Sequence, residues 1–79
     1  MRNYIDILED IITRLKNTEF EDLGIDIEIP FRSYGSSLEI CSEVRYKING
    51  FEKKNIKVRQ LIGAQIDEFN EYCKFIKLN

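Results

Sequence analysis

The 79-residue chain has no histidine, no tryptophan and only two cysteines. Without histidine it lacks the commonest general base, every Ser-His or Cys-His nucleophile pair and the usual nitrogen ligand of zinc. Two cysteines are too few for a thiolate zinc site or a disulfide framework. We therefore interpret Cys41 and Cys73 as small, partly buried hydrophobes, with a regulatory or intermolecular disulfide as the alternative.

Glycine is also scarce, and the four glycines are too scattered to form a phosphate-binding loop. The best group of carboxylates consists of Asp26, Glu28, Glu39 and Glu43. Arginine and lysine share their predicted face, so we interpret it as a solvated charged surface. The sequence therefore predicts no catalytic residue, no cofactor and no metal ion, and we expect a protein that is not an enzyme.

Long apolar runs are absent too. No run approaches the roughly 20 residues that a membrane-spanning helix needs. Acidic residues interrupt the apolar stretch near the N-terminus, where a signal peptide needs a continuous one. We therefore expect a cytoplasmic protein without membrane contact, folded as a single domain over residues 1–79.

Two segments have the apolar periodicity of a helix. Residues 4–16 place apolar side chains at three- and four-residue steps, and Asn3 precedes them as the predicted N-cap. The stretch 17–24 then forms either one extra helical turn or a loop. Residues 59–77 carry a second apolar stripe, made by Ile62, Ile66, Phe69, Cys73 and Ile76. We predict a helix over each of the two periodic segments.

The segments between them alternate apolar and polar residues, which is typical of strands with one buried face. Residues 25–33 contain Pro30, so we predict an edge strand there. Residues 38–48 form the longest predicted strand, and the Asn-Gly pair that follows indicates a tight hairpin. A third strand over 51–57 must then pair back, and its poor alternation makes it either bulged or very short.

These elements predict an α+β fold in α-β-β-β-α order. The domain would have two layers, with both helices packed on one face of a three-stranded antiparallel β-meander. This order is similar to that of the double-stranded-RNA-binding domain. The similarity is confined to topology, because the chain lacks that family's Pro-x-Tyr segment and Gly-Pro-x-His loop.

Charge is distributed unevenly, although the net charge is only −2. An acidic segment contains no base and consists of Glu19, Glu21, Asp22, Asp26 and Glu28. A basic segment contains a single acid and includes Arg45, Lys47, Lys53, Lys54, Lys57 and Arg59. Acidic surfaces of small proteins imitate a nucleic-acid backbone and occupy basic grooves, whereas basic clusters contact phosphates.

The leading hypothesis is a non-enzymatic protein-binding domain that acts by surface complementarity. Its small size and lack of motifs are typical of phage and mobile-element proteins that inhibit a host nucleic-acid-handling machine, as anti-CRISPR proteins do. The acidic segment would enter a basic groove of that complex. Tyr34 and Phe51, at predicted turns, would anchor the contact, unless they cap the ends of the core.

Two alternatives come from other classes of protein. In the first, the chain is a small nucleic-acid-binding module that uses the basic segment 45–59. In the second, it is a self-assembling structural domain. Its acidic and basic halves would then pair head to tail in a homo-oligomer, or the strand over 25–33 would pair with its copy.

Overall fold

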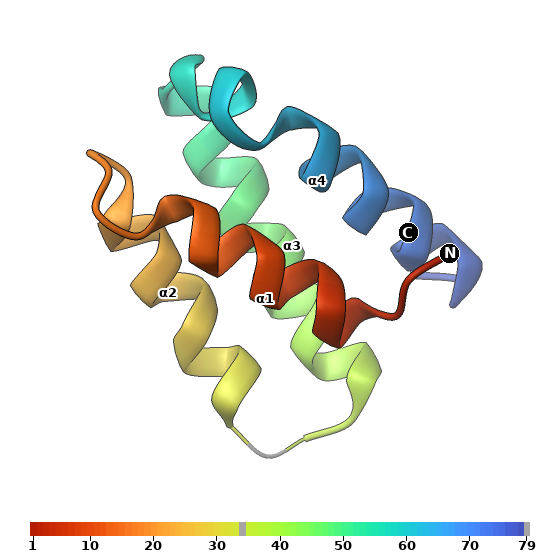
Figure 1. The fold of residues 1–79 in the computed structure, drawn as a ribbon. Coiled ribbons are helices and arrows are strands. Elements are labelled where there is room, and N and C mark those ends of the chain that lie inside the picture. Colours follow the sequence, from red (N-terminus) through yellow and green to blue (C-terminus); the bar gives the residue numbers. More distant parts are fainter. Residues whose placement is uncertain (34, 79) are drawn as a thin grey trace.

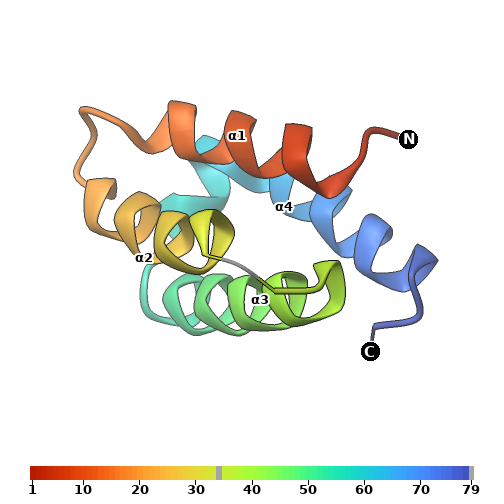
Figure 2. The ribbon, with the colours of Figure 1, turned by 90° about the horizontal axis from the view of Figure 1, so that it is seen from below.

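The computed structural model describes residues 1–33 and 35–78, and within these residues it contains helices and no strand. The four helices are α1 (Tyr4–Leu15), α2 (Glu21–Arg32), α3 (Ser37–Lys54) and α4 (Lys57–Phe75). Each packs on its neighbours along the chain, and α1 also packs on α4 (Figure 1). In Figure 2, α1 and α3 lie on opposite sides, with α2 and α4 between them. The predicted α+β fold is therefore wrong, and its topological similarity to the RNA-binding domain disappears with it.

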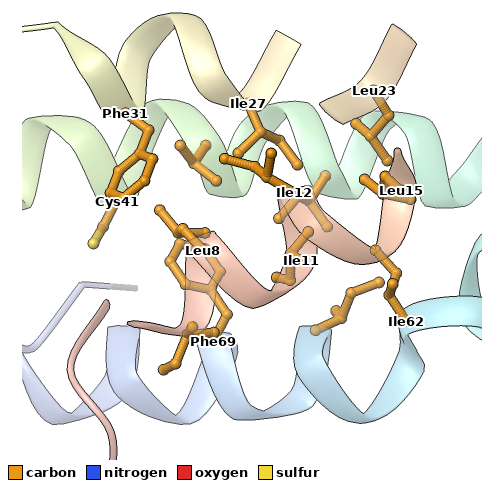
Figure 3. Packing of buried hydrophobic residues seen from close by; sticks show 14 of the residues in the cluster. Leu8, Ile11, Ile12, Leu15, Leu23, Ile27, Phe31, Cys41, Ile62 and Phe69 are labelled. Carbon is orange, nitrogen blue, oxygen red and sulfur yellow. The ribbon is translucent and has the colours of Figure 1, made fainter. Parts of the chain in front are cut away.

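Apolar side chains from all four helices fill one core (Figure 3). Leu8 and Ile11 of α1 meet Ile27 of α2 and Phe69 of α4 in this core, and all four side chains are fully buried. No polar or charged side chain is buried in the part of the chain that the structure describes. The charged residues that the sequence singles out therefore lie at or near the surface.

The two helices predicted at the ends of the chain are confirmed. Helix α1 begins after Asn3, whose side-chain oxygen accepts a hydrogen bond from the backbone N–H of Asp6 at 3.1 Å. This is the expected N-cap. Helix α4 covers most of the predicted range and kinks at Ile62, where φ is −132°. It buries the predicted stripe, except that Ile76 is only half-buried.

Helix α2 replaces the predicted edge strand over residues 25–33. It buries apolar residues at four-residue steps, namely Leu23, Ile27 and Phe31. A strand would have buried Ile25 and Ile29 together with Ile27, but these two side chains are 50% and 61% exposed. Pro30 has no backbone N–H and so removes one helical hydrogen bond, and the helix stops two residues later at Arg32.

Helix α3 replaces the longest predicted strand and the predicted hairpin. It buries Ile40, Cys41, Val44 and Ile48, a helical pattern that no strand of one parity shares. The Asn49-Gly50 pair lies inside the helix on its exposed side. The third predicted strand, over 51–57, does not form. It divides into the last turn of α3, a two-residue linker and the first residue of α4.

Side-chain hydrogen bonds set the ends of α2 and α3. The Glu21 carboxylate accepts from the backbone N–H of Asn17 at 3.1 Å, which ties the first turn of α2 to the linker after α1. Ser36 caps α3 by accepting from the backbone N–H of Glu39 at 3.2 Å. Gly24 lies where α2 contacts α1, since a Cβ atom there would lie 3.4 Å from the Cβ of Leu15. The contacts of Glu21 and Gly24 hold α2 against α1 and the linker that follows it.

None of the described helices combines the length and the apolar character that crossing a lipid bilayer would require.

Candidate functional site

The acidic segment folds mainly into the surface of α2. Glu19 lies in the linker before the helix, and the other four acids lie within it. Glu21 and Glu28 line a groove that α1 residues share, so they face the α1 side. Asp26 lines a hollow that α3 residues share, and Asp22 precedes it by one turn on the same side. The structure thus places two carboxylates along each side of α2.

Ile25 and Ile29 occupy the middle of this arrangement. They lie four residues apart, so both project from the side of α2 that faces away from the core. We call this surface the α2 outer face, and it consists of Glu21, Asp22, Ile25, Asp26, Glu28 and Ile29. Protein interfaces commonly have an apolar centre surrounded by a polar or charged rim, as this face does.

The two sides of the α2 outer face differ in how their charges are engaged. On the α1 side, Arg32 contacts Glu28 at 3.4 Å and also pairs with Glu9 of α1. On the α3 side, Asp22 and Asp26 form no ion pair with any described residue. The Asp22 carboxylate is therefore available to a partner, whereas Asp26 lines a hollow that it shares with three lysines of α3. The face as a whole carries four carboxylates, with the Arg32 guanidinium at its end and Lys16 of the linker lining the groove beside Glu21 and Glu28.

Phe51, one of the two predicted aromatic anchors, is not part of this face. Phe51 is half-buried and packs edge-to-face against Phe20, with ring centroids 6.0 Å apart. This contact belongs to the end of the core. Tyr34 lies outside the described residues. The sequence pattern does not identify Ile25 and Ile29 as surface residues, because a strand over 25–33 would bury both.

The predicted basic segment does not form one patch. Arg59 is engaged by Glu52 at 3.1 Å and by Asp67 at 2.6 Å. Arg45 donates a hydrogen bond to the backbone carbonyl of Leu78 at 3.0 Å and so fastens the chain end to α3. Lys57 begins α4 at another surface, beside the linker that follows α1. Only three residues of the segment stay together, around Gly50 on α3, and these are Lys47, Lys53 and Lys54.

The two cysteines are free thiols in the core, one on α3 and one on α4. A hydrogen bond with Cys73 and burial among apolar side chains together raise the pKa of the Cys41 thiol. Their burial fits the interpretation of small core hydrophobes. The strand-pairing form of self-assembly is wrong, because residues 25–32 are helical.

Comparisons with protein-family models, with curated proteins and with solved structures found no match for the chain. The functional argument therefore starts from the α2 outer face itself.

Proposed function

We propose that the protein is a non-enzymatic binding domain that docks its α2 outer face onto another protein. The observation that carries this proposal is the pair of exposed isoleucines between two rows of carboxylates. Charge complementarity selects the partner, which must present a basic surface with an apolar centre. Nucleic-acid-binding proteins have such surfaces, so we propose that the domain inhibits a nucleic-acid-handling protein by covering its basic groove.

Energetic arguments support a docking role for Ile25 and Ile29. Burying the exposed half of each side chain would contribute about 1 kcal/mol, at about 25 cal/mol per Å² of apolar surface. Within α2 the same side chains add little, because β-branched residues are weak helix formers and these two avoid the core. The surrounding carboxylates would raise the association rate toward a basic partner and make it depend on salt.

A defined probe tests the docking surface. The probe is a helical peptide with a stripe of leucines flanked on both sides by lysines, and calorimetry measures its binding to the native protein. The double variant Ile25→Ala with Ile29→Ala removes the apolar centre and leaves every charge in place. We expect the dissociation constant to rise about 30-fold, the equivalent of about 2 kcal/mol.

The matched control removes exposed apolar side chains from other helices. Leu38 of α3 is 49% exposed and Phe75 of α4 is 71% exposed. The variant Leu38→Ala with Phe75→Ala should bind the peptide as the native protein does. Equal binding by the native protein and the Ile25, Ile29 double variant would show that the peptide senses net charge alone, and the docking surface would then be wrong.

The inhibitor part of the proposal needs a natural partner. The native chain and the Ile25, Ile29 double variant serve as paired baits in a cell lysate, and only proteins enriched by the native bait are considered. We expect a nucleic-acid-binding protein among them, and we expect the purified native chain to displace its nucleic acid. A differential partner that keeps its nucleic acid in the presence of the chain would contradict the inhibitor proposal.

A further inference from the structure

A hollow opens on the exposed side of α3 where Gly50 has no side chain. A Cβ atom built at Gly50 would meet no neighbouring heavy atom within 4 Å, so the helix backbone is open to a ligand here. We call this site the glycine hollow, and its lining includes Tyr46, Lys47, Lys53 and Lys54. Glycine at such a position allows close approach of a ligand to the backbone.

Helix geometry gathers positive charge around the glycine hollow. Lys47, Lys53 and Lys54 precede or follow Gly50 by three or four residues, so all three surround it on the helix surface. None of the three forms an ion pair with a described residue. Asp26 of α2 stands at the rim and offsets one of these charges. The hollow therefore keeps an excess of positive charge that anionic oxygens would satisfy.

An aromatic ring stands beside these lysines. Tyr46 precedes Gly50 by one turn and is 80% exposed, and its ring joins no aromatic pair among the described residues. A ring with that exposure is open to stacking. Exposed aromatics beside lysines are the combination that binds single-stranded nucleic acid, in which bases stack on rings and phosphates meet cations.

We propose that the glycine hollow binds single-stranded nucleic acid, with phosphates among the three lysines and a base stacked on Tyr46. A duplex would satisfy the lysines, but its bases are stacked on one another and leave Tyr46 without a partner. An acidic peptide likewise offers charge and no base. This site lies on α3, so the inference goes beyond the proposed docking of the α2 outer face.

The experiment measures the anisotropy of a fluorescent single-stranded oligothymidylate. We expect saturable binding that weakens with salt, with a log–log slope of about −2 for about three phosphate contacts. Tyr46→Ala should weaken binding by about 5- to 150-fold, the range for loss of one stacked base. The triple variant of Lys47, Lys53 and Lys54 to Gln should remove most of the salt dependence.

A matched triple variant distinguishes binding at the glycine hollow from attraction by the net charge of the protein. Changing Lys16, Lys74 and Lys77 to Gln alters the net charge by the same amount at surfaces away from the glycine hollow. This control should bind the oligonucleotide as the native protein does. An equal loss of affinity in both triple variants would overturn the proposal.

Gly50→Gln supplies a second readout. Glutamine is a good helix former, so this variant should raise the melting temperature, and its side chain fills the hollow, so it should weaken oligonucleotide binding. Higher stability with unchanged binding would overturn the proposal. Equal affinity for oligothymidylate, its duplex form and polyglutamate would overturn it too. The Ile25, Ile29 double variant should bind the oligonucleotide normally, so failure of the docking surface and failure of the hollow are distinguishable.

Discussion

Replacing Gly50 by alanine should stabilise the protein, because Gly50 lies inside α3. Glycine in a helix interior is less favourable than alanine by about 0.8–1 kcal/mol. The added Cβ meets no neighbour within 4 Å, so no steric cost offsets the gain. We expect the free energy of unfolding to rise by about 0.5–1 kcal/mol. For a chain of this size the melting temperature should rise by about 2–8 °C.

The assay follows helical circular dichroism during thermal and urea unfolding. The control is Gly35→Ala in the linker before α3, where φ is +151°, a conformation that alanine rarely adopts. This variant should melt below the native protein. A tight hairpin turn would need positive φ at Gly50, and alanine would then destabilise it. A fall in melting temperature for Gly50→Ala would therefore refute the helix across the Asn-Gly pair.

Three further predictions concern other contacts. Ser36→Ala removes the N-cap of α3 and should lower the free energy of unfolding by about 1 kcal/mol in urea titration; an unchanged midpoint would contradict the cap. Cys41 and Cys73 are both fully buried, so a thiol reagent at about pH 8 should label them only as fast as the protein unfolds, whereas rapid labelling of the folded protein would contradict this. The hydrogen bond from Arg2 holds the pKa of Glu68 below its ordinary value, so this pair stabilises the fold above about pH 4 and loses its effect as the pH falls through the lowered pKa. Arg2→Ala should accordingly reduce the loss of stability between about pH 7 and pH 3, and an identical pH profile would contradict the pairing.

Two of the four helices, α1 and α4, could be predicted, because their apolar spacing mixes steps of three and four. In α1, the run of Ile7, Leu8, Ile11, Ile12 and Leu15 has no counterpart in a strand. In α2 and α3 the buried residues recur mainly every four positions, as Ile40, Val44 and Ile48 do. A spacing of four fits a period of two as well as a period of 3.6, so alternation alone could not separate strand from helix.

The exposed apolar residues distinguish the helical period of 3.6 from the strand period of two. Ile25 and Ile29 share the parity of Ile27, and a strand therefore predicts all three on one buried face. Packing decided the outcome, because Leu23, Gly24 and Ile27 give α2 a continuous helical contact with its neighbours. A local signal for α3 was also present in the sequence, since Ser36 and Glu39 have the spacing of a capping box.

The composition of the candidate sites could be predicted, but their geometry could not. The acidic segment was visible in the sequence, whereas its apolar centre depends on α2 being a helix. The basic segment appeared continuous, but Arg45 and Arg59 are engaged by other groups in the folded chain. Lys47 and Lys54 come together only because seven residues make about two helical turns.

The exposure of single isoleucine methyl groups tests the account most directly. A soluble paramagnetic agent broadens the nuclear magnetic resonance signals of methyl groups that reach the surface. We predict strong broadening for Ile25 and Ile29 and protection of Ile27, because the first two lie on the α2 outer face and the third lies in the core. Equal protection of all three would indicate a strand at this position, and it would contradict both the helical bundle and the docking surface on α2.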